Sequence, residues 1–572
     1  MNKKRTYRQQ ALTRLVIVIG ILIALNVLSS SYFTRVDLTA DRRYTLTDST
    51  KALLRNLKDV VFVKVYLKGD FPAGFQRLAT STKEMLDEFK VYGGEKIQYE
   101  FNDVITGKSE KELRDVVKEM SQKGLAPTNV QNRGGDEYSQ QIVIPGALVT
   151  FGSREAPVNL LENTPGTGAQ TALNNSIAHL EYNLTRSIRQ LTQITKPRIG
   201  IIRGHGEMED ERLVDFLSSM ADFYDPQFIT LSDVVSIPDN IRTILIIRPQ
   251  QTFSDKDKFK IDQYVMNGGT VLWLVDALNA GMDSVVAKRS FIALDYPLNL
   301  DDQLFRYGAR INPDLLLDLQ CNPVPLLTSM EGQQPKFTLF PCFYFPVLTP
   351  VGSHPIVRNI DAVATQFAGT IDTVALSSVK KIPLLVSSKN SRIVFTPWMV
   401  DFRDLRNRPN ENEYRAKQQM GAVLLEGVFP SLFQNRLTPE MQAVLQDSLK
   451  QPFKAQSAPT KMIVISDGDM VANEFNAQGQ PLALGFYRYT GEYFGNKTFL
   501  MNCVDYLAGF PELINTRSKT IMLRLLDEAK VKAGRTAWVW INLAAPIGAL
   551  LLFGLVFNVI RYQKFALRKQ RP

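Results

Sequence analysis

The stretch FKIDQYVMNGGTVLWLVDA, residues 259–277, decides the fold class of this chain. The sequence predicts a helix from about Ser254 to Met266 that stops at the following Asn-Gly-Gly. The next residues, TVLWLVDA, are apolar at nearly every position, which is typical of a strand in a parallel sheet covered on both faces. A helix, a glycine stop and a buried strand in succession indicate an α/β fold.

The same alternation continues on both sides of this stretch. RIGIIRG (198–204) and TILIIRP (243–249) read as further strands, KMIVISDGDM (461–470) returns to a buried strand, and a packed helix follows it. We therefore expect a doubly wound sheet. Between these strands TVAL, PLLV and RIVF also read as strands, and the segment 328–346 reads as an irregular excursion.

A smaller α/β unit precedes this sheet. VFVKVYL (61–67) predicts a strand, and a helix, a strand (97–104), a second helix and two more strands (142–152 and 157–161) follow. The order βαβαββ predicts a thioredoxin-like topology, without the CxxC of a redox protein. A long amphipathic helix that ends before Pro197 then leads into the larger sheet.

Each end of the chain carries an apolar run without charge. Leu15 to Thr34 spans 20 residues and Thr536 to Ile560 spans 25 residues. A helix rises about 1.5 Å per residue, so either run reaches across a bilayer core of about 30 Å. We expect one transmembrane helix at each end. The alternatives are a cleaved signal peptide for the first run and a buried core helix for the second.

The basic excess of the chain lies in its two tails. The net charge is +10, and residues 1–14 and 561–572 each carry five basic residues and no acidic one. Ten of the 67 basic residues are therefore in the tails, which leaves 57 basic and 57 acidic residues elsewhere. A neutral body argues against nucleic-acid binding. The positive-inside rule places both tails in the cytoplasm and the body outside it, in the periplasm of a bacterium.

The expected organisation has eight parts. They are the cytoplasmic basic tail 1–14, the first transmembrane helix 15–34, the small α/β domain 35–165, the connecting helix 166–196, the large α/β domain 197–510, the juxtamembrane segment 511–535, the second transmembrane helix 536–560 and the cytoplasmic basic tail 561–572.

Catalytic and metal motifs are scarce. The three cysteines have no CxxC spacing, and Cys321 and Cys342 are either a disulfide or buried free thiols. The chain has only three histidines, so the sequence offers few residues for a metal cluster or for Ser-His-Asp catalysis. GEYFGNKT (491–498) departs from the phosphate-loop spacing, so we do not expect this chain to hydrolyse ATP.

The first candidate ligand site is Gly-His-Gly-Glu at 204–207, directly after a predicted parallel strand. Ligands of doubly wound sheets bind at the carboxyl ends of strands, where His205 and Glu207 can act as acid and base. The alternative is a tight turn in which His205 caps the next helix.

The second candidate is Ser-Asp-Gly-Asp at 466–469, which follows another buried strand. Asp467 and Asp469 can bind a cation or a sugar hydroxyl, or they can serve as turn and cap residues. If both loops lie at one sheet edge, they line a common crevice.

Several motifs together resemble the auxiliary component of ABC-2-type transporters, and within that family its gliding-motility-associated substrate-binding branch. These motifs are IIRGHGE, FKIDQYVMNGGTVLWLVDA, LNLDDQLFRYGARINPDLLLD, GSHPIV, LLEGVFPSLF, VISDGDMVANEFN and GNKTFLMNCVDYLAG. The resemblance covers nearly the whole chain. It implies an inner-membrane protein that works with an ABC permease and a cytoplasmic ATPase in gliding motility or export, with an unknown substrate and no cofactor.

The resemblance also implies that the large domain is glutamine-amidotransferase-like. Enzymes of that fold use a cysteine at a strand-to-helix elbow, and none of the three cysteines lies in such a setting. We therefore expect a non-enzymatic binding or scaffold subunit. The alternative is a membrane-anchored envelope-processing enzyme that uses a crevice at His205, Glu207, Asp467 and Asp469.

Overall fold

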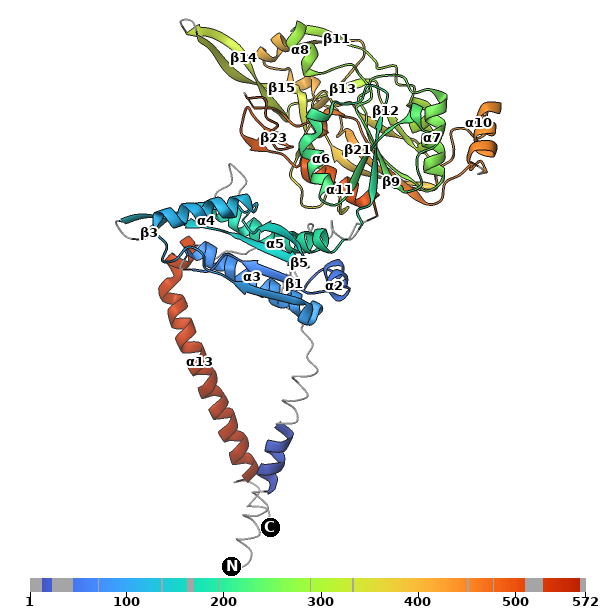
Figure 1. The fold of residues 1–572 in the computed structure, drawn as a ribbon. Helices are drawn as coiled ribbons and strands as arrows, with labels where there is room; N and C mark the ends of the chain where they lie inside the picture. Colours follow the sequence, from blue (N-terminus) through green and yellow to red (C-terminus); the bar gives the residue numbers. More distant parts are fainter. Residues whose placement is uncertain are drawn as a thin grey trace, which may run out of the picture. The chain divides into compact units, whose positions relative to one another are not determined.

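The computed structural model describes residues 13–22, 45–161, 169–449, 452–509 and 528–565, apart from positions 70, 135, 136, 194, 289, 332, 333 and 477. The chain forms two compact units, residues 1–520 and residues 521–572 (Figure 1). The first unit contains a four-stranded sheet and a larger sheet, and the second contains one long helix. The predicted α/β class is confirmed.

The smaller sheet has the strand order β2-β1-β5-β6. β1 (Val61–Val65) pairs in parallel with β2 (Ile97–Phe101) and antiparallel with β5 (Gly146–Phe151). β6 (Arg154–Asn159) pairs antiparallel with β5. Each strand overlaps a stretch that the sequence predicts as extended.

Helices cover both faces of this sheet. Val149 packs with α3 (Ala73–Gly93) and α5 (Ala169–Thr192), together with α2 (Asp48–Arg55). Its neighbour Leu148 packs instead with α4 (Glu110–Gln122). Adjacent residues of a strand point to opposite faces, so α4 lies across the sheet from α3 and α5.

One hairpin of this region escaped prediction. β3 (Thr128–Gly134) pairs antiparallel with β4 (Glu137–Val143). Both strands are mainly polar and lack the apolar alternation by which a half-buried strand is recognised.

The parallel half of the larger sheet has the order β22-β10-β9-β7-β8. Its strands are β7 (Arg198–Arg203), β8 (Asp225–Thr230), β9 (Ile241–Ile247), β10 (Thr270–Leu274) and β22 (Thr460–Ile465), and all neighbours pair in parallel. β8 lies on one side of β7, and the later strands lie on the other side. The chain therefore reverses its direction of winding between β7 and β9, and ligands of such sheets bind at this point.

The residues of β10 are all buried, as the sequence predicts. Leu272 and Leu274 pack in the core with α6 (Val214–Ala221) and α11 (Asn496–Leu507). The alternate residues Val271 and Trp273 pack in the core with α7 (Asp255–Met266) and α9 (Asp301–Tyr307). The sheet is thus covered by helices on both faces.

The second half of the larger sheet is antiparallel and is formed by residues that come between β10 and β22 in the chain. It continues from β22 through β21 (Met420–Gly427), β18 (Val379–Val386) and β15 (Gln334–Pro350) to β14 (Cys321–Glu331), and β16 (Val363–Ala364) pairs with β15. The same stretch of chain also contains two short helices and three short antiparallel ribbons: α8 (Met282–Lys288), α10 (Pro439–Ala443), β11 (Ser290–Ala293) with β20 (Trp398–Asp401), β12 (Ala309–Ile311) with β17 (Ile371–Thr373), and β13 (Asp314–Asp318) with β19 (Ser391–Phe395). A further ribbon, β23 (Phe486–Tyr487) with β24 (Glu492–Tyr493), follows β22.

The prediction of an irregular excursion over 328–346 is wrong. This segment lies in the hairpin of β14 and β15. Prolines argue against strands, but β14 is the outermost strand of the sheet and Pro323 lies opposite Pro341, where few ladder hydrogen bonds are lost. β8 was also missed, because DPQFIT has a proline and too few apolar residues to stand out.

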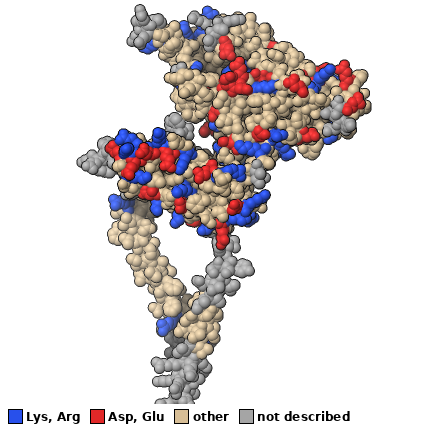
Figure 2. All heavy atoms as spheres, in the orientation of Figure 1, with Lys and Arg blue, Asp and Glu red and all other residues tan. Residues whose placement is uncertain are grey.

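The second unit contains α13 (Glu528–Phe565), whose residues 534–564 are long and apolar enough to cross a membrane. Residues 536–560 of this helix carry no charge, and its surface in Figure 2 is largely uncharged, whereas both signs of charge are interspersed over the visible surface of the α/β part of the chain. The predicted second span, 536–560, falls on this helix. Of the predicted first span, residues 15–22 are helical and the rest lies outside the described residues.

Candidate functional site

The loop after β7 lies at the point where the winding of the sheet reverses. Gly204 and Gly206 have φ values of +111° and +70°, a region that favours glycine, so the two residues allow the chain to turn sharply around His205. The backbone N–H groups of Gln250 and Gln251, in the loop after β9, both donate to the carbonyl oxygen of His205 at 2.8 Å. The two loops at the switch point are therefore joined by backbone hydrogen bonds.

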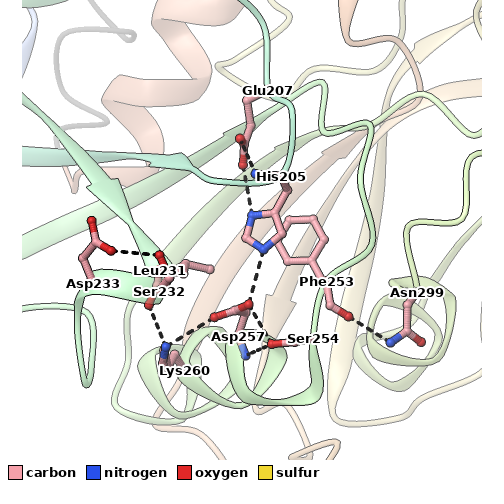
Figure 3. A network of polar contacts seen from close by, with 10 residues as sticks. All are labelled: His205, Glu207, Leu231, Ser232, Asp233, Phe253, Ser254, Asp257, Lys260 and Asn299. Carbon is pink, nitrogen blue, oxygen red and sulfur yellow. Dashed lines mark hydrogen bonds and ion pairs between the residues drawn. The ribbon is translucent and has the colours of Figure 1, made fainter.

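The His205 ring lies between two carboxylates (Figure 3). Its Nδ1 is 3.3 Å from Oε1 of Glu207, and its Nε2 is 3.4 Å from Oδ2 of Asp257. The other Glu207 oxygen accepts the His205 backbone N–H at 2.8 Å. The ring stacks on Phe253 with a centroid distance of 3.7 Å and an interplanar angle of 5°. His205 and Glu207, predicted as a pair, are thus in direct contact.

Asp257 connects this pair to helix α7. Ser254 caps α7 by accepting the Asp257 N–H, and its hydroxyl donates to Asp257 Oδ2 at 2.7 Å. Lys260 donates to Oδ1 at 3.3 Å and to the Leu231 carbonyl at 2.6 Å. Burial acts to raise the pKa of Asp257, but these hydrogen bonds and the Lys260 charge outweigh it and lower the pKa. The ionised carboxylate is therefore favoured beside the His205 ring.

The enclosure of these side chains limits what they can do. The His205 side chain is 6% exposed and that of Glu207 is 1% exposed. Both ring nitrogens face carboxylates, and Phe253 covers one ring face. In this state the pair holds the β7 loop against α7, and a solute reaches the ring only if the loop opens.

Asp467 and Asp469 lie together at the carboxyl end of β22. Asp467 Oδ1 accepts the backbone N–H groups of Asp469 at 2.8 Å and Met470 at 3.2 Å, and its Oδ2 accepts that of Gln366 at 2.9 Å. Asp467 therefore serves as a turn residue, which is the alternative to ligand binding that the sequence left open. A third carboxylate, Asp276 at the end of the β10 stretch, accepts the Gly468 N–H.

Arginines neutralise part of this acidic cluster. Arg248, which directly follows β9, places its Nε 3.0 Å from Asp276 and 3.4 Å from Asp469. Arg212 approaches Asp469 at 3.5 Å. A β-carbon added at Gly468 would lie 2.6 Å from the Arg248 β-carbon, so this approach requires a glycine.

The three carboxyl groups of the cluster have raised pKa values. Burial raises the pKa of Asp276 to about 6; repulsion from Asp469 adds to this, while Arg248 opposes it. Burial also raises the pKa of Asp467 well above its ordinary value, with the charges of Asp276 and Asp469 acting the same way. Burial raises the pKa of Asp469 although Arg248 and Arg212 act against it. Strongly shifted carboxyls in a buried cluster are a common feature of functional sites and also of structural ion-pair networks.

A small cavity borders Asp469. Its volume is about 40 Å³, and its walls include Gln366, Tyr487 and Asn496 but no residue of the His205 loop. A water molecule needs about 10–15 Å³ of such space, so the cavity holds a few waters rather than a substrate. The two predicted pairs therefore lie at the same edge of the sheet, with the ends of β9 and β10 between them, and each has its own set of contacts.

Three residues that complete these contacts were not predicted. Asp257 lies in the first turn of a helix, where an acidic residue is expected for capping alone. Arg248 and Asp276 each follow a buried apolar strand, and this placement is the signal that could have identified them. Within the described part of the chain, no group of three His, Cys, Asp or Glu side chains is arranged to hold a metal ion, and all three cysteines are free thiols.

Comparison with known proteins finds a matching family for the region of each sheet. Residues 196–503 match a family described as an ABC-type uncharacterized transport system, and residues 40–150 match a domain of unknown function. An uncharacterized protein of Borreliella burgdorferi is 19% identical over 533 residues, which cover 91% of this chain and 92% of that protein. A solved structure, the mmIFT52 N-terminal domain, is 11% identical and covers 55% of this chain and 97% of its own, but its TM-score of 0.30 is too low to support an argument.

Proposed function

Because this chain belongs to the family of auxiliary components of ABC-type transport systems, we propose that it is a non-enzymatic, extracytoplasmic binding or scaffold subunit of such a system. Its partners in this proposal are an ABC permease and a cytoplasmic ATPase. The observation that carries the non-enzymatic part is the enclosure of His205, whose ring nitrogens face Glu207 and Asp257 inside the protein.

We place the protein in a bacterial inner membrane with two spans, both termini cytoplasmic and the body periplasmic. The apolar helix α13 supports the second span, and the acid-free basic tail that follows it supports the orientation. The first span, 15–34, rests on its charge-free sequence and on the helix at 13–22.

Two finer fold assignments belong to the same proposal. The order β2-β1-β5-β6, with helices on both faces, supports a thioredoxin-like domain over 35–165. The parallel order β22-β10-β9-β7-β8 supports a glutamine-amidotransferase-like domain over 197–510. Gliding motility or an export process is the physiological role that we propose, on the sequence resemblance alone.

We keep His205, Glu207, Asp467 and Asp469 as the proposed ligand site of this subunit. Their common position at the carboxyl edge of the sheet and the raised pKa values of the acidic cluster support this assignment. The conservative variants His205→Asn, Glu207→Gln, Asp467→Asn and Asp469→Asn test it. The expected result is a loss of transport measured at a temperature where each variant is still folded, and full transport by all four folded variants would refute the proposed ligand site.

The experiment that tests the function is a mild-detergent pull-down of the full-length protein, compared with a chain that lacks 536–572. We expect an ABC permease and an ATPase, identified by mass spectrometry, to co-purify with the full-length protein and to be lost on truncation. A clean full-length protein without these partners would refute the transporter assignment and favour the anchored enzyme.

A further inference from the structure

Helix α13 contains an asparagine and a proline one turn apart within its apolar stretch. Asn542 and Pro546 both lie inside the continuous helix Glu528–Phe565. Among the described residues, none hydrogen-bonds to the Asn542 side chain, which is exposed on the helix surface. A polar group on a membrane helix requires a partner, so this position indicates what lies against the helix.

Asn542 falls within the hydrocarbon and not at its boundary. The apolar stretch 534–564 is centred on Ala549, and Asn542 lies about 10 Å from that centre along the helix. The hydrocarbon core reaches about 15 Å to either side of the midplane. Trp538, one turn closer to the helix start, is suited to the interface, and Asn542 lies beyond it in the lipid.

Pro546 makes the requirement stronger. In a helix the N–H of each residue donates to the carbonyl four residues earlier, and for Asn542 that donor would be Pro546, which has no N–H. The proline ring also pushes this carbonyl away from its neighbours. Asn542 therefore presents two carbonyl oxygens without a donor, one from the backbone and one from the side chain.

The missing groups are donors and not acceptors. The amide N–H groups of Asn542 can fold back onto the carbonyl of the preceding turn, which has a spare lone pair. The two carbonyl oxygens find no donor within the helix, because the N–H groups of a helix interior already donate to backbone carbonyls. A partner must therefore bring a hydrogen-bond donor to this depth of the membrane.

The face around Asn542 also allows a close approach. Ala545 and Ala549 follow at i+3 and i+7, so they share one face of the helix with Asn542, and all three are exposed. Small residues let the backbones of two membrane helices come close enough for interhelical hydrogen bonds. Leu551 lies on the opposite face and provides a control position.

We propose that a membrane-spanning helix of the permease packs on the Asn542–Ala545–Ala549 face and donates a hydrogen bond to the Asn542 carbonyl groups. The donor is a hydroxyl or amide side chain at about 10 Å from the midplane, level with Asn542. This inference rests on the proposed function, which places α13 in a membrane beside a permease.

Two measurements on the full-length protein in native membranes test the inference. The first places a photo-crosslinking residue at Ala545, Ala549 or Leu551 and identifies the adduct by mass spectrometry. The second measures permease co-purification for Asn542→Leu, with Asn558→Leu as a matched control. Asn558 lies about 13 Å from the midplane, so its side chain can reach the headgroup layer.

We expect permease adducts from Ala545 and Ala549 and not from Leu551. One interhelical hydrogen bond in a membrane corresponds to a change of about three- to thirtyfold in affinity, which Asn542→Leu should cost and Asn558→Leu should not. Equal adducts from both faces, unchanged permease recovery with Asn542→Leu, crosslinks only to this chain's own first span, or adducts only between two copies of this chain would each overturn the inference. If wild-type protein recovers no permease at all, the proposed function fails as well, whereas recovery that is indifferent to Asn542 refutes only this contact.

Discussion

Replacing Arg248 with methionine tests how the acidic cluster is held in the core. Arg248 is the cation nearest to both Asp276 and Asp469, at 3.0 Å and 3.4 Å. Methionine keeps most of the side-chain length and removes only the charge and its hydrogen bonds. Asp469 would then keep Arg212 alone, at 3.5 Å, and Asp276 would lose the cation that it now contacts.

The expected loss of stability is large and depends on pH. Removing one partner of a buried ion pair costs about 3–5 kcal/mol, because the remaining charge is buried without compensation. Protonation relieves part of this cost, and the pKa of Asp276 is already raised to about 6. We therefore expect a loss of about 3–5 kcal/mol at pH 7 that shrinks as the pH falls to about 5.

Trp273 provides the signal for the assay, since it lies in β10 three residues before Asp276 and is fully buried. Tryptophan fluorescence, to which Trp273 and the three other tryptophans contribute, follows unfolding in urea, and the variant is compared with the wild type at both pH values. The matched control is Lys256→Met, which removes a surface pair with Glu440 whose side chains are 71% and 74% exposed. Such a pair contributes about 0–1 kcal/mol.

Two results would refute this reasoning. If Arg248→Met unfolds at the same urea concentration as Lys256→Met at neutral pH, the arginine does not compensate the buried carboxylates. If its loss is as large in acid as at neutral pH, the effect comes from packing and not from charge.

Three further predictions concern other parts of the chain. Because the folded pKa of Asp276 is raised from 3.8 to about 6, the stability that its protonated form contributes is fully present below about pH 4 and is lost as the pH rises through about 6. Urea titrations should show the free energy of unfolding fall over this range, with a flatter pH profile for Asp276→Asn. His205→Ala should destabilise the protein by about 2–4 kcal/mol, because it removes the ring's contacts with Glu207, Asp257 and the face of Phe253. A His205→Ala variant as stable as the wild type would contradict the network in Figure 3. Ser109→Ala should cost about 1 kcal/mol by removing the capping box of α4, and Ser121→Ala, in the same helix, is the control; equal melting temperatures for the two variants would contradict this role.

Sequence patterns identified the parts of the fold that are buried on both sides. VLWL is apolar at every position because helices cover both faces of β10, and a strand with one face in water would carry polar residues at alternate positions. β8 and the β3–β4 hairpin carry no comparable pattern, since they contain few apolar residues. Prolines misled the prediction at β14 and β15, because a sequence does not show that a strand lies at the edge of a sheet.

The candidate site was predictable only in part for a related reason. His205 and Glu207 are two residues apart, and their position after a buried strand indicates the switch point of the sheet. Asp257 lies 52 residues further along the chain, and its contact with the ring depends on where α7 packs. Arg248 follows β9 and Asp469 follows β22, and the two residues meet because of the order of the strands in the sheet. The sequence does not show this order.

The insertion between β10 and β22 has a consequence for folding of the chain during its synthesis. These strands are neighbours in the sheet, yet residues 275–459 come between them in the chain. Until β22 has been synthesised, β10 keeps an open, apolar edge of the kind that promotes aggregation. The larger sheet can close only when most of the body is already outside the ribosome, shortly before α13 follows. Completion of the sheet and arrival of the anchoring helix are therefore nearly simultaneous events, and a chaperone that shields the waiting edge would act during this interval.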